Sequence, residues 1–199
     1  KEAKSISVDM LKRVGISDAE NRFNQYAFEL SGGMRQRAMI AMALSTMPKL
    51  LLADEPTTAL DVTIQAQVIN LIKDIIKEYK MGVMFITHDL GVIAQTADTV
   101  AVMYLGAIVE KGPVREIIKN PKHPYTRGLL KALPDVNNLD APLQPIPGSI
   151  PSPLERPSGC VFRTRCPDPT HECREGHIEM GLIEVIQGNW VDQCCVNCG

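Results

Sequence analysis

Two short apolar runs with a helical segment between them constrain the fold of this chain more than any other feature. The runs cover residues 50–53 and 83–87, and both have the length and composition of buried strands. Between them, apolar side chains recur at the i, i+3, i+4 spacing of an amphipathic helix, at Ile64, Val68, Leu71, Ile72, Ile75, Ile76 and Tyr79. Strand, helix and strand in this order form a βαβ unit, so we expect an α/β fold with a mainly parallel sheet.

Five consecutive parts are expected along the chain. Residues 1–47 hold helices, residues 48–112 hold the sheet, and residues 113–133 hold two short helices. Prolines recur through residues 134–158, which predicts an extended, semi-rigid linker. Residues 159–199 contain all six cysteines and few apolar residues, so we expect a small module there that a metal holds together.

Charge and composition exclude several classes of function. The net charge of −2 argues against nucleic acid as a partner, because phosphate neutralisation needs a basic surface. No segment approaches the roughly 20 apolar residues that a membrane-spanning helix needs. The chain starts at Lys1 without a signal-peptide pattern, and it reads as a segment of a longer protein. Without export, clustered cysteines more often hold a metal than form disulfides.

Three positions carry candidate chemistry for a phosphate ligand. Ser31-Gly32-Gly33 stands at a helix start, where N–H groups and the helix dipole favour an anion, although a simple serine cap is the alternative. The acids at 54 and 55 follow the first strand, where one can bind Mg²⁺ and the other can polarise a water, or both form a charged turn. His88 follows the second strand, where it could donate to a phosphate or be purely structural.

The order of these motifs resembles the ATP-binding-cassette (ABC) family. Ser31 to Gln36 resembles the signature motif, residues 50–54 resemble Walker B, and residues 59–61 resemble the D-loop. The resemblance implies a partial RecA-like ATPase domain over residues 48–112, with the end of the helical subdomain before it. It also implies ATP and Mg²⁺ as ligands, with Asp54 at the metal, Glu55 and His88 as catalytic residues, and nucleotide contacts from Ser31, Gly32, Gly33, Gln36 and Asp61.

A second motif narrows the resemblance to oligopeptide, dipeptide and nickel importer ATPases. His123-Pro124-Tyr125 precedes a short helix, the proline-rich stretch and the cysteines, as in the C-terminal extension of that subfamily. The residues alone indicate only that Pro124 begins a helix and that Tyr125 packs. The resemblance implies a second ABC ATPase subunit, two transmembrane permease subunits, a substrate-binding protein, and a peripheral location on the cytoplasmic face of the cell membrane.

One departure from the family pattern changes what this chain can do alone. A cassette needs the phosphate-binding loop Gly-x-x-x-x-Gly-Lys-Ser/Thr, and this sequence contains no Gly-Lys pair. We therefore expect a fragment without ATPase activity of its own, whose residues 31–33 would serve the nucleotide of a partner cassette. The alternative is a non-catalytic accessory protein with an iron–sulfur or zinc module.

The cysteine spacing favours a large metal centre. Five residues separate Cys160 from Cys166, and six separate Cys166 from Cys173. Structural zinc sites use closer pairs, whereas iron–sulfur clusters take four thiolates. The resemblance implies a [4Fe–4S] cluster with these three ligands and Cys194 as the fourth, and Cys195 or Cys198 as alternates. Zinc is the alternative metal, supported by the pair Cys195-x-x-Cys198 and by His171 and His177.

Overall fold

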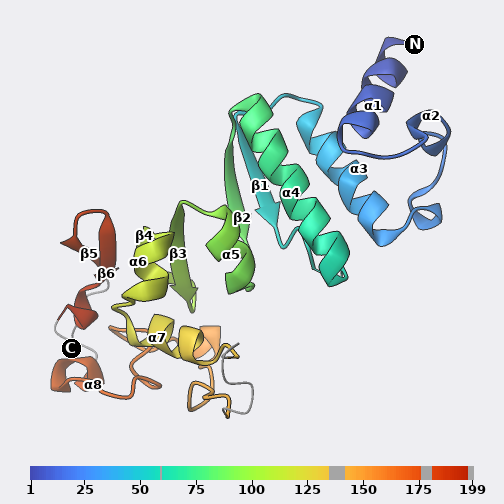
Figure 1. The fold of residues 1–199 in the computed structure, drawn as a ribbon. Helices are drawn as coiled ribbons and strands as arrows, with labels where there is room; N and C mark the ends of the chain where they lie inside the picture. Colours follow the sequence, from blue (N-terminus) through green and yellow to red (C-terminus); the bar gives the residue numbers. More distant parts are fainter. Residues whose placement is uncertain (59, 135–141, 176–180, 197–199) are drawn as a thin grey trace. The chain divides into compact units, whose positions relative to one another are not determined.

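The computed structural model describes residues 1–58, 60–134, 142–175 and 181–196. It divides into two compact units, residues 1–96 and residues 97–199, which follow one another along the colour bar of Figure 1. In the described part of the chain, none of the helices has both the length and the apolar character that crossing a bilayer requires.

The first unit contains the predicted βαβ arrangement. Strands β1 (Leu50–Asp54) and β2 (Gly82–Ile86) pair in parallel, and Asp54 lies opposite Ile86. Helix α4 (Val62–Tyr79) connects them and lies along the strand pair in Figure 1. The other elements are α1 (Glu2–Arg13), α2 (Ala19–Arg22), η1 (Ala27–Glu29), α3 (Gly32–Leu44) and α5 (Leu90–Thr96). The parallel pair and the connecting helix confirm the α/β prediction.

The core of the first unit forms where helices α1, α3 and α4 meet β1. Asp61 caps α4, because its Oδ1 accepts the N–H of Ile64 at 2.9 Å. The apolar face of α4 then packs against side chains from the other elements. The buried members of this cluster are Met10, Val14, Ile16, Ile40, Ala41, Leu44, Leu51, Val68, Ile72, Ile75 and Met81.

Neither strand is buried on both faces, which differs from the expectation of fully buried strands: one face of β1 is buried, and one face of β2 is partly buried. Leu51 and Ala53 are buried, whereas Leu50 and Leu52 are 57% and 63% exposed. Side chains of a strand alternate between its two faces. Leu51 joins the core that α4 covers, and the alternate residues of β1 lie outside it.

The second unit is built on an antiparallel sheet with the strand order β3-β4-β6-β5. Strands β3 (Thr99–Tyr104) and β4 (Ala107–Pro113) form a hairpin, as predicted. Leu105 and Gly106 both have positive φ at its turn, the geometry that favours a right-twisted hairpin. The other elements are α6 (Val114–Lys119), α7 (Pro124–Lys131), η2 (Pro153–Glu155), α8 (His171–Glu175), β5 (Leu182–Ile186), β6 (Asn189–Asp192) and η3 (Gln193–Cys195).

The cysteine-rich segment shares its core with the preceding residues, which departs from the expected separate module. Strand β6 pairs with β4, and Val191 lies opposite Glu110. Val161 and Phe162 are fully buried in a cluster that also contains Val102 and Val109. The segment has too few apolar residues for its own core, so it completes the core of the β3–β4 hairpin instead.

The described part of the proline-rich stretch packs against other residues of the second unit. The Arg165 guanidinium donates to the carbonyl oxygens of Ile146 and Pro147, both at 2.9 Å. The side chain of Ile146 lies so close to α7 that a Cβ added to Gly128 would approach its Cγ1 to 2.8 Å. Residues 135–141 of the predicted linker lie outside the described residues.

Candidate functional site

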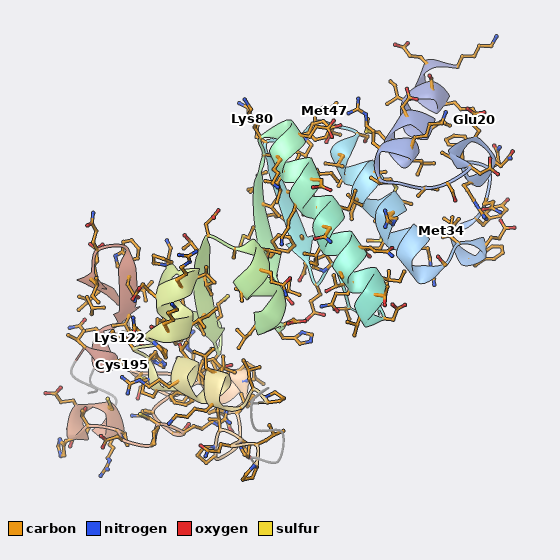
Figure 2. The ribbon with its side chains drawn as sticks, viewed as in Figure 1. Glu20, Met34, Met47, Lys80, Lys122 and Cys195 are labelled. Carbon is orange, nitrogen blue, oxygen red and sulfur yellow. The ribbon has the colours of Figure 1, made fainter. Side chains whose placement is uncertain are left out.

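The first group of predicted site residues lies at the start of α3. Ser31 precedes the helix in an extended conformation, and its Oγ accepts the N–H of Met34 at 3.3 Å. Figure 2 labels Met34 at this end of the helix. Ser31 and Gly32 are exposed, and Gln36 lies one turn further along α3, partly buried. The serine therefore caps the helix through Met34, and the N–H groups of Gly32 and Gly33 in the same first turn lie where an anion can bind.

The two glycines of this group differ in their surroundings. A Cβ on Gly33 would lie 2.8 Å from Cγ2 of Ile64 on α4, whereas a Cβ on Gly32 would make ordinary contact with Leu60 at 3.6 Å. Gly33 is therefore needed for the close approach of α3 to Ile64 of α4. Ala59, the first residue of the predicted D-loop, lies outside the described residues.

The second group lies at the carboxyl ends of the two parallel strands. Asp54 ends β1, and the next residue, Glu55, has a left-handed backbone with φ of 44° while its N–H donates to Ile86 O at 2.8 Å. Such a conformation is uncommon for a residue with a Cβ. It directs the chain out of the sheet at the point where Glu55 and His88 meet.

The structure brings the two predicted catalytic residues into contact. Nδ1 of His88 lies 3.2 Å from Oε1 of Glu55, and the hydroxyl of Thr58 donates to Oε2 of Glu55 at 2.8 Å. The hydrogen bond from Thr58 and then that from His88 lower the pKa of the Glu55 carboxyl. Glu55 is thus an ionised acceptor at neutral pH, and a carboxylate can only accept, so Nδ1 of His88 carries a proton.

Asp89 supports this site, although the sequence analysis did not single it out. Its Oδ1 accepts the N–H groups of Gly91 and Val92, and its Oδ2 accepts Nε2 of Gln65 on α4 at 2.9 Å. Burial acts to raise the pKa of Asp89, but the bond from Gln65 and the two backbone bonds lower it overall. An acid directly after His88 and before a helix is the capping signal that could have identified it.

The third group gathers the cysteines of the second unit. None of the five described cysteines is in a disulfide, and four of them are buried. The sulfurs of Cys160 and Cys194 share a hydrogen bond, and Cys166 interacts electrostatically with Cys160 and Cys173. The sulfur of Cys195 lies 3.4 Å from that of Cys194. The predicted ligands therefore come together in one cluster, whereas Cys198 lies outside the described residues.

Burial and mutual hydrogen bonding disfavour free thiolates at Cys160 and Cys194. The hydrogen bond with Cys194, followed by burial, raises the pKa of the Cys160 thiol far above its ordinary value. The bond with Cys160 acts to lower the pKa of Cys194, but the bond with Cys195 and burial raise it overall. A cation bound by the sulfurs reverses this, because a coordinating thiol is deprotonated.

Two residues that the sequence analysis did not assign to a site lie among these cysteines. His123 and Asp192 are fully buried, and they offer donor atoms within 4.8 Å of one another and of the sulfurs of Cys160 and Cys194. Burial, followed by the charge of Arg127, lowers the pKa of His123 to about 4. Burial raises the pKa of Asp192. His123 was visible in the His-Pro-Tyr motif, but no pattern in the sequence marks Asp192.

The histidines named for a zinc site do not join the cluster within the described residues. The side chain of His171 is 82% exposed, and its Nε2 lies 3.3 Å from Oε1 of Glu175. His177 lies outside the described residues. The contribution of histidine to the cysteine cluster comes instead from His123.

Two family models match the chain. One describes the ABC transporter and covers residues 2–58, and the other describes the oligopeptide/dipeptide transporter C-terminal region and covers residues 109–173. The first contains the signature-like residues, Asp54 and Glu55, and the second contains His123 and three of the clustered cysteines.

Proteins named as transport ATP-binding proteins match most of the chain. The oligopeptide transport ATP-binding protein AppD of Bacillus subtilis is 51% identical over 173 residues, which is 87% of this chain and 53% of AppD. The dipeptide transport ATP-binding protein DppD of Haemophilus influenzae is 48% identical over 175 residues, 88% of this chain and 53% of DppD. The chain thus spans about half the length of these relatives.

Solved structures show the same fold. A metal-chelate-type ABC transporter in an inward-facing conformation matches 63% of this chain and 47% of its own, with a TM-score of 0.54 and 27% identity. An ATP-binding cassette of an ABC transporter in its ADP conformation matches 64% of this chain and 50% of its own, with a TM-score of 0.55 and 22% identity.

Proposed function

Because the chain belongs to the ABC transporter ATPase family, in the branch with the oligopeptide/dipeptide transporter C-terminal region, we propose that it forms part of the ATP-hydrolysing subunit of a peptide importer. The observation that carries the proposal is the contact of Glu55 with His88 at the ends of the parallel strands. The alternative of a non-catalytic accessory protein does not need this contact, and the relatives above are named as transport ATP-binding proteins.

Each predicted site residue of the first unit has a proposed role in ATP hydrolysis. MgATP, when bound, supplies the phosphoanhydride and neutralises its developing charge. Asp54 would hold the Mg²⁺, and Glu55 would accept a hydrogen bond from the attacking water. Because Nδ1–H of His88 is directed at Glu55, His88 would donate toward the terminal phosphate through Nε2 when that nitrogen also carries a proton. Ser31, Gly32, Gly33, Gln36 and Asp61 would face the nucleotide of a partner cassette.

The proposed assembly follows from the importer function. It contains a second ABC ATPase subunit, two transmembrane permease subunits and, outside the membrane, a substrate-binding protein. The chain itself would lie on the cytoplasmic face of the cell membrane as a peripheral subunit. Transport of peptides, rather than of nickel, is supported by the names of the relatives.

The cysteines of the second unit are the proposed ligands of a [4Fe–4S] cluster. None of Cys160, Cys166, Cys173 and Cys194 is in a disulfide. Cys160 shares a hydrogen bond with Cys194, and Cys166 interacts electrostatically with Cys160 and Cys173, so these four side chains could hold such a group together. The bond between Cys194 and Cys160 supports Cys194 over Cys195 as the fourth ligand. A zinc ion is the alternative centre for the same thiolates.

The test of the importer function is ATP hydrolysis and peptide uptake by the full-length protein with its permease. We expect Glu55→Gln to lower hydrolysis by a factor of about 10² or more, with Glu20→Gln, an exposed residue of the same unit, as a neutral control. Residues 1–199 alone should show only background hydrolysis, because they contain no Gly-Lys phosphate loop. Full activity of Glu55→Gln in the assembly would refute the proposal.

A further inference from the structure

His123 is a fully buried histidine with one nitrogen in use. It caps α7, and its Nδ1 accepts the backbone N–H of Tyr125 at 3.1 Å. A neutral imidazole carries one proton, and a nitrogen that accepts a hydrogen bond does not carry it. The bond from Tyr125 therefore fixes the tautomer of His123 and places the proton on Nε2.

The other nitrogen of His123 is a buried donor without a partner. Among the residues that the structure describes, Nε2 has no hydrogen-bond partner, although it is shielded from solvent. Leaving such a donor unpaired costs about 1–3 kcal/mol, so an acceptor is expected beside it. Among the Cys, Asp and Glu side chains that the structure describes, Cys160, Cys194 and Asp192 have potential acceptor atoms within 4.8 Å of a ring nitrogen of His123.

The surroundings of His123 hold its ring in one orientation. Its backbone N–H donates to Oε2 of Glu110 at 3.0 Å, and its ring centroid lies 5.7 Å from that of Phe162. The preceding residue, Lys122, lines the same small pocket as Cys195, and Figure 2 labels the two residues one above the other. Both the backbone and the ring of His123 are therefore held in place beside the cysteines.

We propose that Nε2–H of His123 donates a hydrogen bond to the metal-bound sulfurs of Cys160 and Cys194, and that this bond positions and tunes the metal centre. The inference rests on the metal centre of the proposed function. A thiolate is a stronger acceptor than a thiol, so the bond strengthens when the cysteines bind metal. Hydrogen bonds to cluster sulfurs are among the factors that set the reduction potential of an iron–sulfur centre.

The alternative that His123 is itself a metal ligand conflicts with its tautomer. Nε2 could bind a metal only through its lone pair, which requires the proton to move to Nδ1. That proton would then point at the N–H of Tyr125 and break the cap of α7. His123 therefore acts on the centre through the sulfurs and not as a ligand.

Asp192 is the competing acceptor for the same proton. Its Oδ2 is buried and has no partner among the described residues, whereas its Oδ1 accepts the N–H of Gly181 at 3.4 Å. Asp192 offers the donor one unpartnered oxygen, whereas two metal-bound sulfurs, those of Cys160 and Cys194, would face it. An experiment must nevertheless separate the two acceptors.

The experiment uses the full chain, purified anaerobically with iron and sulfide available. Iron and sulfide content of the unmodified chain tests the centre itself, and its midpoint potential is then measured for three variants. His123→Leu removes the donor, His123→Gln restores an N–H at the position of Nε2, and His171→Leu is the exposed control. We expect a shift to lower potential in His123→Leu, partial return in His123→Gln, and no shift in His171→Leu.

Each outcome decides the proposal. An unchanged potential in a fully loaded His123→Leu variant overturns the donor role while the cluster stands. A shift that disappears in the Asp192→Asn background assigns the proton to Asp192 and also overturns it. If His123→Leu does not load, the same comparison is made with His123→Gln and His123→Met. Zinc without iron in the unmodified chain refutes the cluster, and a nitrogen ligand in its X-ray absorption spectrum would refute the donor assignment as well.

Discussion

The carboxylate of Glu110 accepts the backbone N–H of His123 at 3.0 Å, and both residues are fully buried. Its other oxygen accepts the N–H of Lys122 at 2.7 Å. One acid on β4 therefore satisfies two consecutive N–H groups of the segment that leads into α7. Because Glu110 lies opposite Val191 of β6, the same position of β4 joins the His-Pro-Tyr segment to the strand β6 of the cysteine-rich segment.

The first prediction follows from this contact. Glu110→Ala leaves the two N–H groups of Lys122 and His123 buried and unpaired, so we expect a loss of about 2–4 kcal/mol in unfolding free energy. Glu184→Ala is the matched control, since Glu184 accepts the N–H of Gly188 at 2.6 Å in an exposed turn. Denaturant unfolding of both variants measures the difference. Equal losses of unfolding free energy in the two variants would show that the buried contact stabilises the fold no more than the exposed one.

The second prediction concerns the pKa of Asp89. Gln65→Ala removes the hydrogen bond that lowers the pKa of Asp89 most. The pKa should therefore rise toward its ordinary value of 3.8. Since the folded pKa is lowered, the stabilisation by Asp89 is present above the unfolded value and disappears as the pH falls through the folded one. Carboxyl NMR titration of the two proteins measures the change. An identical titration in both would exclude Gln65 as the cause.

The sequence predicted the local elements of this chain better than their assembly. The strands, α4 and its cap at Asp61 follow from apolar spacing and capping preferences, which act within a few residues. The pairing of β6 with β4 depends on residues about 80 positions apart and has no local signal. The short span of β6 also hid it, since Trp190 and Val191 alone do not indicate a strand.

In the candidate sites, too, features with a local sequence signal were predicted, whereas contacts between distant segments were not. Glu55 and His88 were predicted from their places at two strand ends, and parallel strands bring such ends together. The gathering of His123 and Asp192 around the cysteines could not be predicted, because three separate segments supply these residues. The packing role of Gly33, whose missing Cβ allows the close approach of Ile64, was also not predicted, and its role at the nucleotide stays a prediction.

The third prediction separates the two glycines of the signature-like motif. Gly33→Ala places a Cβ 2.8 Å from Cγ2 of Ile64, whereas Gly32→Ala makes a normal contact with Leu60 at 3.6 Å. We expect Gly33→Ala to cost about 1–3 kcal/mol of stability by overpacking, and Gly32→Ala to be neutral or slightly stabilising. Thermal unfolding of the two variants compares them. The double variant Gly33→Ala with Ile64→Val should recover part of the loss.

The fourth prediction tests the role of Ser31 in a partner's site. Ser31→Arg in the full-length protein fills the anion site at the start of α3, so peptide uptake should be abolished. Nucleotide binding to the isolated full-length subunit should remain largely intact, because that nucleotide lies in another cradle. Ser31→Ala is the control for the lost cap, at about 1 kcal/mol of stability. A fall in subunit nucleotide binding as steep as the fall in uptake would show that Ser31 serves its own subunit.

The last prediction concerns the metal centre of the second unit. Anaerobically purified protein should be brown and contain iron and sulfide, and Cys166→Ser should bleach it. Cys166 interacts with both Cys160 and Cys173, so its loss opens the middle of the ligand set. Cys194→Ser should bleach the protein too, whereas Cys195→Ser should keep its colour if Cys194 is the fourth ligand. Visible absorption and iron analysis measure these differences.

The structural consequence of Cys166→Ser should stop at the boundary between the two units. Residues 97–133 share one buried cluster with the cysteines, so loss of the centre should loosen the β3–β4 hairpin together with β6, because a bound metal contributes its binding free energy to folding. The first unit has its own core and should keep its protection. Hydrogen exchange of the loaded and bleached proteins reports each unit separately. Faster exchange confined to residues 159–196 would show that the cysteine-rich segment folds apart from the hairpin, and stoichiometric zinc without iron would replace the cluster by the zinc alternative.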